Sequence, residues 1–372
     1  MALPASTARR PRYGGTLRVE IAAALNSLDP AVAAPNPEIS SAKDQFVELI
    51  GSARADRSSP TSASASPFRI TAWEPAKHAT LVANDESAGG HPFVDSIEIQ
   101  MGRSAKDRLL DLELSKTDLA EIPAEEARRA AERGVRLSTS QPDELIALVF
   151  VSARPLAEDS RAREALAQAI DRASIANFIL QKEGEPAGGL LPQWSSGTAF
   201  LFSTVADPGR AKEQWSRIAG SPKIWLGYDA GDALEQAVAE RIAVNAREAG
   251  ISMSTIATPG SSPVPAKADA KLVRLRMSSS HPRIALTSFL AALDPVAGID
   301  ASPLPDSASP GQMFEREQAI VSSRWVVPLV WLPQVYGLGR RVRDWKAPGP
   351  GESWPLADVW LDDMGTTAGG AK

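Results

Sequence analysis

The chain contains no cysteine among its 372 residues. Disulfide bonds, zinc sites built from thiolates and a cysteine nucleophile are therefore excluded. It also lacks an excess of positive charge, because 40 basic residues face 45 acidic ones and leave a net charge of −5. That balance gives no basic footprint for nucleic acid. No apolar run reaches the roughly 18 residues that a membrane-spanning helix needs.

The motifs of several enzyme classes are missing as well. Residues 337–339 begin a G-x-G pattern but lack the third glycine of a dinucleotide-binding loop. There is no G-x-S-x-G nucleophile elbow, no H-E-x-x-H metal motif and no P-loop. The histidines His78, His91 and His281 lie in separate turn segments, and none has a partner at metal-ligand spacing. We therefore expect a protein that is not an enzyme and that holds neither a cofactor nor a metal.

At 372 residues the chain is long enough for two domains of roughly 150 residues each. Its most informative stretch is 67–101, where three short β-strands follow one another. The breaks between them carry turn-forming pairs such as Glu-Pro, Asn-Asp and Gly-Gly. The predicted strands of this stretch are 68–73, 79–83 and 96–101.

Further elements follow from the same patterns of apolar residues. Outside the first stretch, the predicted strands are 16–21, 144–151, 223–228, 251–256 and 325–332. The predicted helices are 105–116, 124–133, 160–182 and 232–249. Residues 31–66 lack periodicity, and 51–66 is Ser/Ala-rich enough to predict a flexible loop. Pro328 interrupts the last strand, which favours either an edge position or a segment that crosses between domains.

The order of several motifs resembles the extracellular solute-binding proteins of the peptide/nickel class, family 5, which serve ABC importers. Stretch 67–101 resembles that family's series of a Pro-Phe strand, a Trp-x-Pro turn, an Asn-Asp turn and a Pro-x-x-Asp-x-Ile strand. Residues 159–172, DSRAREALAQAIDR, resemble its helix pattern D-x-R-V-R-x-A…A-I-D-R. The loop 187–192 and the return strand at Pro328-Leu329 continue the same order.

The resemblance implies an α/β fold with the two-lobe, periplasmic-binding-protein-like architecture of type II and two hinge-crossing strands. Lobe one would be residues 13–145 plus 334–372, lobe two would be 153–325, and the crossings would be 146–152 and 326–333. A ligand would bind between the lobes, with closure about the hinge. The expected partners are a small-molecule or peptide-like ligand and an ABC permease in the membrane, but no nucleic acid.

The same resemblance implies a monomer in the periplasm. The first residues, MALPASTARRPRYGG, carry basic clusters without the apolar core of a secretory signal, so either the signal has been removed or the protein is cytosolic. The resemblance favours removal of the signal. Lobe one is expected to be reduced, because only 31–66 stands where typical members carry an extra subdomain. The alternative function is that of a non-transport relative, which senses a ligand or acts as an interaction scaffold.

The ligand is expected to differ from a standard peptide. In the peptide binders of this family, an Asp three residues before an Asp-Pro turn pairs with the α-amine of the ligand. Here Asp294-Pro295 stands as that turn, and the earlier position is Ala291. Without the carboxylate, a peptide amine loses its charge-assisted partner. The sequence therefore predicts a small solute or an atypical peptide.

Six candidate ligand-binding residues lie on segments that the resemblance places at the cleft: Trp194, Trp331, Tyr336, Asp294, Asn26 and Asp29. The aromatic side chains would supply contact area for a ligand, or would pack the core between the lobes. Asp294 would contact a cationic group, or would cap its own turn. The polar pair beside the N-terminal turn would line the cleft. Residues 340–343 form a small basic cluster, which is either a solvated face or an anion contact.

Overall fold

The computed structural model of the chain describes residues 10–29, 42–46, 66–87, 89–197, 202–258 and 267–362. The predicted flexible loop lies outside these ranges apart from Ser66, as does most of 31–66. Most of the described strands join one mixed sheet in the order β2-β3-β4-β1-β5-β11-β6-β10-β8-β9, with β7 paired to β11. The strands are β1 Thr16–Glu20, β2 Phe68–Glu74, β3 His78–Ala83, β4 Ser96–Gln100, β5 Leu119–Ile122, β6 Arg136–Phe150, β7 Glu185–Pro186, β8 Ile224–Asp229, β9 Met253–Thr258, β10 Ala270–Arg276 and β11 Val326–Leu338, with β12 Val342–Arg343 and β13 Trp360–Leu361 as a separate pair.

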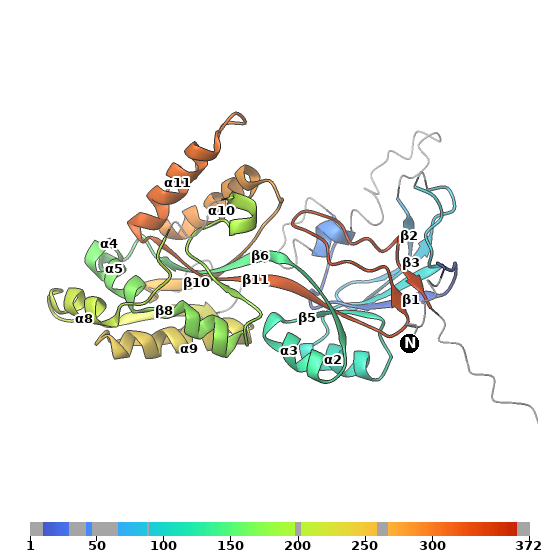
Figure 1. Cartoon of the computed structure of the whole chain (residues 1–372), viewed down its shortest axis with the longest axis horizontal. Coiled ribbons are helices and arrows are strands. Elements are labelled where there is room, and N and C mark those ends of the chain that lie inside the picture. Colours follow the sequence, from blue (N-terminus) through green and yellow to red (C-terminus); the bar gives the residue numbers. More distant parts are fainter. Residues whose placement is uncertain are drawn as a thin grey trace, which may run out of the picture.

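Helices cover both faces of one half of this sheet, as Figure 1 shows. There α10 and α11 lie above the strands and α8 and α9 lie below them, while α2 and α3 lie below the other half. The helices are α2 Ala105–Glu113, α3 Ala124–Glu132, α4 Pro155–Glu158, α5 Ser160–Ala169, α6 Arg172–Ser174, a π-helix Ile175–Ile179, α7 Gln193–Ser196, α8 Pro208–Ser216, α9 Ala233–Glu248, α10 Pro282–Ala297 and α11 Pro310–Ser323. The molecule is therefore an α/β protein with two lobes, as the sequence predicted.

Two long strands, β6 and β11, run through both lobes side by side (Figure 1). They pair in antiparallel fashion from Arg136 opposite Leu338 to Val149 opposite Val326. As a whole β11 lies between β5 and β6, but β5 pairs with it only from Val335 to Leu338. At Pro328 the strand pairs with β6 alone, so the edge that the proline suggested is present locally, within a strand that passes from one lobe to the other. A register shift of the β6 ladder follows directly, between Pro328 and Val330.

The core is divided by the sheet. Ile146, Leu148 and Phe150 of β6 belong to the cluster that also contains the apolar faces of α3, α5 and α9. The alternate residues of the same strand, from Leu145 to Val149, pack in a second cluster with α10 and α11. Both faces of this strand are therefore buried, which explains its continuous apolar sequence. A third cluster fills lobe one between β1, β3, β4 and the C-terminal segment.

The predicted helix over 160–182 is wrong in its length. The helix α5 ends at Ala169, because Ile170 has an extended backbone (φ −75°, ψ 116°). Asp171 then accepts a hydrogen bond from the backbone N–H of Ser174 and starts a new helical turn. A side chain that caps a new turn competes with continuation of the old helix, and periodicity alone does not reveal this competition. At the other end of α5, Asp159 caps the helix by accepting the Arg161 N–H.

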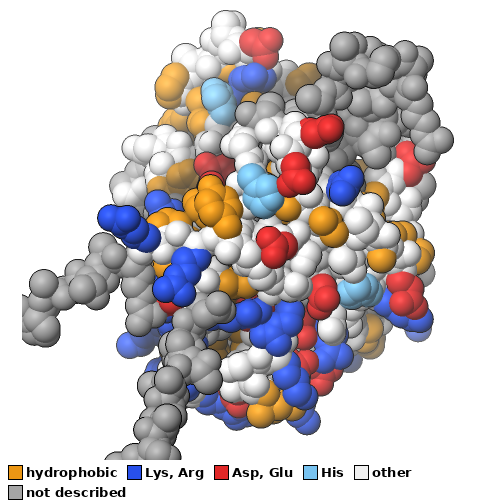
Figure 2. Space-filling model, turned by 90° about the vertical axis from the view of Figure 1, so that its right-hand side faces the viewer, with side chains coloured by type: hydrophobic (Ala, Val, Ile, Leu, Met, Phe, Trp, Pro, Cys, Tyr) orange, Lys and Arg blue, Asp and Glu red, His pale blue; other side chains and the backbone are white. Residues whose placement is uncertain are grey.

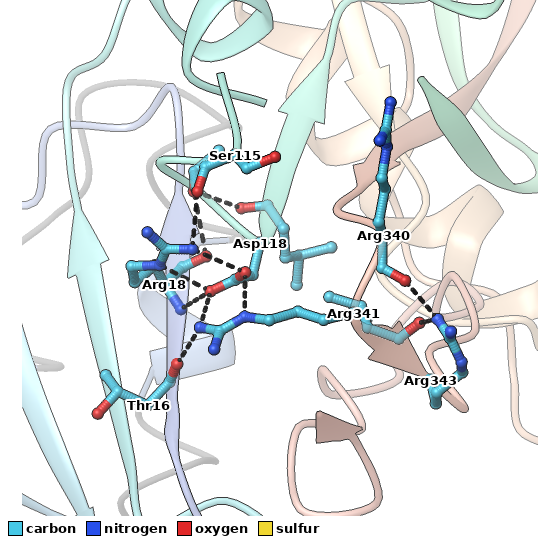
Figure 3. Close-up of polar contacts among 10 residues, drawn as sticks. Thr16, Arg18, Ser115, Asp118, Arg340, Arg341 and Arg343 are labelled. Atoms are coloured by element: carbon cyan, nitrogen blue, oxygen red, sulfur yellow. Dashed lines mark hydrogen bonds and ion pairs between the residues drawn. The ribbon is translucent and has the colours of Figure 1, made fainter. Parts of the chain in front are cut away.

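The far end of lobe one carries intermixed acidic and basic side chains, with Lys and Arg gathered on its lower part (Figure 2). Part of the basic cluster 340–343 is engaged in ion pairs. Arg341 donates two hydrogen bonds to Asp118, which also receives the side chain and backbone N–H of Arg18 (Figure 3). Arg343 pairs in the same way with the buried Asp362. The interpretation of the whole cluster as a solvated face is therefore incomplete, because two of its arginines anchor buried carboxylates.

Candidate functional site

A cavity of about 680 Å³ lies between the two lobes, and residues of both lobes line it. Lobe one contributes the end of β5 and the start of α3, while lobe two contributes β8, β10 and the start of α9. The crossing strands β6 and β11 also line the cavity, between the contributions of the two lobes. The volume falls within the range of about 300–1,000 Å³ that is typical of small-molecule sites. Its charged lining residues are Arg108, Glu121, Glu125, Glu144, Asp229, Asp232, Glu235, Lys271, Arg274 and Arg276.

A second, much smaller cavity of about 30 Å³ adjoins the first. The two share four lining residues, namely Glu121, Arg276, Gln334 and Tyr336. The loop 348–351 of lobe one closes this small cavity against the segment that follows β10. Gly351 is required there, because a Cβ at this position would lie 2.5 Å from the backbone oxygen of Ser278 and the residue has φ +75°.

A chain of ion pairs crosses the floor of the larger cavity. Arg274 contacts Glu144 and donates a bond of 2.6 Å to Asp232, while Arg276 donates a bond of 3.0 Å to the other oxygen of Glu144. Arg274 and Arg276 lie on one face of β10 because side chains alternate along a strand. The register places Arg276 directly opposite Glu144 on β6. Burial acts to raise the pKa of Glu144, but the two guanidinium groups outweigh it and lower that pKa to about 2.

The neighbouring carboxylate, Asp143, has a different environment. It is 3% exposed, and among the other residues that the structure describes only the Gln334 amide donates hydrogen bonds to its carboxylate, at 3.2 and 3.4 Å. Within the described ranges, no Lys or Arg nitrogen forms an ion pair with it at 4.0 Å or less. Burial therefore raises the pKa of Asp143 to about 7, despite the attraction of the more distant Arg276. This carboxyl group faces the small cavity, which Arg276 also lines, but the Arg276 guanidinium is ion-paired with Glu144.

Two helix N-termini, those of α3 and α9, point acidic side chains at the larger cavity. Asp232 caps α9 by accepting the N–H groups of Leu234 and Glu235. Burial raises the pKa of Glu235 to about 7 and also raises that of Glu125 in the first turn of α3. The acidic groups are favoured at these positions by the helix dipoles. Gln181 of lobe two donates to the Glu125 carbonyl at 3.4 Å, so the two lobes also touch beside these helices.

Strand β10 presents an incomplete edge to the cavity. Its partner β8 pairs only with Ala270 and Lys271, whereas β6 pairs with the whole strand. The remaining residues, 272–276, line the larger cavity. Backbone groups on such an edge can bind an extended polar ligand by hydrogen bonding.

The predicted aromatic candidates reach different places. Tyr336 is 3% exposed and lines both cavities, and its hydroxyl donates to the Gln334 side chain at 3.3 Å. Trp194 is 37% exposed, and its indole N–H donates to the Pro142 carbonyl at 2.8 Å, one residue before Asp143. Trp331 is 3% exposed and stacks on Phe289 with ring centroids 6.2 Å apart. Tyr336 thus lies at the cavities, while the contacts of Trp331 are those of a core side chain.

The predicted polar candidates lie elsewhere on the surface. Asn26 and Asp29 are exposed and are absent from the lining of both cavities. Asp294 is exposed as well, and it is not part of a turn: Asp294 and Pro295 lie inside α10, whose burial of Leu293 and Val296 outweighs the cost of a proline in the last turn. The turn interpretation of this pair is therefore wrong.

This correction removes Ala291 from the comparison with peptide binders, because that residue also lies inside α10. The helix instead begins at Pro282 after the cap residue His281. Three residues before this X-Pro pair stands Ser278, which also lacks a carboxylate. No Asp therefore stands three residues before either X-Pro pair.

Sequence reasoning missed four polar residues that line the small cavity, namely Glu121, Asp143, Arg276 and Gln334. They come from β5, β6, β10 and β11, so no sequence spacing connects them. The available signals were an acidic pair directly before an apolar strand and two arginines alternating with apolar residues in 270–276. In the described part of the chain, no group of three His, Asp or Glu side chains is arranged to hold a metal. None of the helices described is long and apolar enough to cross a membrane.

Comparisons with known proteins agree with this geometry. The family described as bacterial extracellular solute-binding proteins, family 5 Middle, matches residues 16–295. The oligopeptide-binding protein AppA of Bacillus subtilis (strain 168) is 25% identical over 122 residues, which are 32% of this chain and 22% of AppA.

Solved structures of the same kind share the fold. The ABC transporter substrate-binding protein CtaP of Listeria monocytogenes superposes with a TM-score of 0.68 at 17% identity, over 80% of this chain and 66% of CtaP. NikA of Brucella suis, in complex with Fe(III)-EDTA, gives 0.69 at 17% identity, over 80% and 68%. DppA of Helicobacter pylori, in complex with the peptide STSA, gives 0.65 at 16% identity, over 80% and 62%. The chain thus spans less than two-thirds of CtaP and DppA. At these identities the likeness shows the two-lobe fold.

Proposed function

The chain belongs to family 5 of the bacterial extracellular solute-binding proteins, and from this membership we propose that it captures a solute between its lobes and delivers it to an ABC permease. The observation that carries the proposal is the cavity of about 680 Å³. Both lobes line it, and the crossing strands lie between their contributions. A ligand held there contacts both lobes at once, so binding favours their closed arrangement.

The lobes that we propose are residues 13–145 plus 334–372 and residues 153–325. The crossings between them are 146–152 and 326–333. The pairing of β6 with β11 supports this division, because these two strands are continuous from one lobe to the other. Closure then takes place by twisting and bending of a paired ribbon. In this movement few interactions within the ribbon change, whereas the contacts between the lobes across the cavity change.

The proposed ligand is a small polar solute or an atypical peptide. The cavity floor carries the ion pairs of Arg274, Arg276 and Glu144, which makes it unsuited to a wholly apolar molecule. The residue three positions before His281, the cap of α10, is Ser278 and not Asp, so a carboxylate that could pair with a peptide amine is missing there. The open edge of β10 offers backbone hydrogen bonds to an extended polar ligand.

The proposed setting is the periplasm, with a monomeric protein that meets a permease in the membrane. The family description places its members outside the cytoplasm, and the two-lobe body can bind a solute without a second copy of the chain. A permease reads the closed state in this proposal, because only closure brings surfaces of both lobes into a fixed relation.

A ligand screen tests the proposal. The purified protein is heated with peptides, amino acids, sugars, amines or metal chelates, and native mass spectrometry shows which of them stay bound. A ligand at one hundred times its Kd should stabilise the protein by about 2.7 kcal/mol. Arg276→Gln should weaken the hit, whereas Arg316→Gln on the surface of α11 should not. Failure of every class to raise the melting temperature would contradict solute capture. A hit that fails to stimulate permease-coupled uptake would instead favour a sensor or scaffold.

A further inference from the structure

The small cavity that adjoins the main one has the size of a functional group and not of a whole ligand. Its volume is about 30 Å³, and a single water needs roughly 10–15 Å³ measured in this way. It therefore holds about two waters, or one small polar group with its attached carbon. Since the two cavities share lining residues, a ligand in the larger one can place a group in the smaller one.

Hydrogen-bond acceptors converge on this cavity from three adjacent strands, β5, β11 and β6. Glu121 of β5 stands directly opposite Tyr336 of β11 in the ladder. One oxygen of Glu121 accepts the Ala22 N–H at 2.9 Å, and the other has no hydrogen-bond partner among the described residues. Asp143 of β6 receives only the long bonds from Gln334. Two carboxylates thus face the cavity with acceptor capacity left over.

The charged residues that line the small cavity are two acids, Glu121 and Asp143, and one arginine, Arg276. The Arg276 guanidinium is already ion-paired with Glu144, which also pairs with Arg274. Among the described residues, Glu121 and Asp143 are therefore the two carboxyl groups at the small cavity that have no ion-pair partner.

Arg276 lines both cavities, and its charge indicates which second group of the ligand would be bound. Among the described residues its guanidinium donates a hydrogen bond to Glu144 alone, although a guanidinium has five N–H donors. The remaining donors are available to an anionic group in the larger cavity. The same positive charge disfavours a second cationic group there, so a ligand with both charges fits the site better than a diamine.

We propose that the ligand is a small zwitterion whose protonated primary amine enters the small cavity between Asp143 and Glu121, while its anionic group meets Arg276. This inference rests on the proposed capture of a solute in the cleft. An ammonium group donates three hydrogen bonds, and the cavity offers the Asp143 and Glu121 carboxylates, the Gln334 amide oxygen and the Tyr336 hydroxyl as acceptors. The raised pKa of Asp143 is consistent with a carboxylate that lacks its cation. Asp143 on the crossing strand thereby supplies the carboxylate that is missing before α10.

Calorimetry with matched probes tests the proposal on the unaltered protein. The probes are the common α-amino acids, their N-acetyl derivatives and the carboxylic acids that lack the amine. The amino acids should include a binder whose N-acetyl derivative and amine-free analogue bind about 10- to 100-fold more weakly. Methylammonium chloride should compete with that binder, whereas tetramethylammonium at the same ionic strength should not, because it exceeds the cavity.

Variants assign the effect to the two carboxylates. Asp143→Asn and Glu121→Gln keep an oxygen acceptor for their present partners and should each lose about 10- to 100-fold in affinity for the amino acid. Asp306→Asn is the matched control, because the Asp306 side chain is 96% exposed and lines neither cavity, and this variant should bind normally. N-acetyl derivatives that bind as tightly as the free amines, or an Asp143→Asn variant with unchanged affinity, would overturn the inference. Solutes without an amine as the sole binders would overturn it and leave solute capture intact, whereas no binding of any class would refute both.

Discussion

Replacement of Asp118 by alanine should destabilise the protein by about 3 kcal/mol. The Asp118 carboxylate is 2% exposed and receives five hydrogen bonds, three from Arg18 and two from Arg341 (Figure 3). Removing one partner of a buried ion pair typically costs about 3–5 kcal/mol. Both guanidinium groups are about one-third exposed, so water solvates them in part when the carboxylate is gone. The expected loss therefore lies at the lower end of that range.

Urea unfolding, followed by tryptophan fluorescence and circular dichroism, measures this loss. The midpoint should fall without a change in slope, and the melting temperature should fall by about 4 °C. The matched control is Asp306→Ala, because Asp306 pairs with Arg283 at 3.0 Å but its side chain is 96% exposed. An exposed pair of this kind contributes about 0–1 kcal/mol. A loss below about 1 kcal/mol for Asp118→Ala, or a loss equal to that of the control, would refute the reasoning.

The pH dependence of the same difference provides a second check. Burial acts to raise the pKa of Asp118, but the hydrogen bonds from Arg341 and Arg18 outweigh it and the net shift is downward. A depressed pKa in the folded state means that the contribution is fully present above the unfolded pKa of about 4. It is lost as the pH falls through the folded pKa. The stability difference between wild type and Asp118→Ala should thus be constant from pH 5 to 8 and shrink below about pH 4.

Three further outcomes follow from the structure. Burial raises the pKa of Glu20, Asp143 and Glu235 to about 7, so the folded state keeps these protons to higher pH than the unfolded chain does. The melting temperature should therefore be lower at pH 8 than at pH 5.5. A melting temperature that rises over this window would show that these carboxyl groups are ionised in the folded state. Trp194→Ala should cost only about 1 kcal/mol in urea unfolding, because the side chain is 37% exposed and makes one indole hydrogen bond, and a loss above 3 kcal/mol would make it a core residue. Gly351→Ala should push the loop 348–351 away from lobe two, because the new Cβ would lie 2.5 Å from the backbone oxygen of Ser278. The radius of gyration measured by small-angle scattering should therefore increase. An unchanged radius would mean that the loop moves without moving the lobes.

Local pattern was sufficient for elements whose apolar spacing reflects one buried face. The predicted strands 68–73, 79–83 and 96–101 are confirmed as β2, β3 and β4 with ends displaced by a residue or so. Strand β5 was missed because its four residues, LAEI, are too few to show a period. Strand β10 was missed because arginines stand at alternate positions, where the ion pairs with β6 and α9 take the place of apolar burial. These ion pairs are tertiary contacts between segments far apart in the sequence, so the sequence of β10 alone does not predict them.

The site was harder to predict than the fold. Of the six candidates, Tyr336 lies at the cavities, because it stands on β11 a few residues beyond the predicted crossing 326–333. The carboxylates Glu121 and Asp143 were not among the candidates. Acidic residues in sequence are usually solvated, and only the packing of three strands shows that these two are brought together. The roles of Trp194, Asn26, Asp29 and Asp294 in binding stay predictions.

The place of β11 in the sheet has a consequence for how the chain reaches its fold. This strand is the inner neighbour of both β5 and β6, yet it is nearly the last part of the sheet to be synthesised. Until residue 338 has left the ribosome, the backbone edges of β5 and β6 lack their shared partner, and the sheet of either lobe is incomplete. Neither lobe can therefore complete its sheet before the other. The native sheet forms only after residue 338 has been synthesised, and the insertion of β11 completes both lobes.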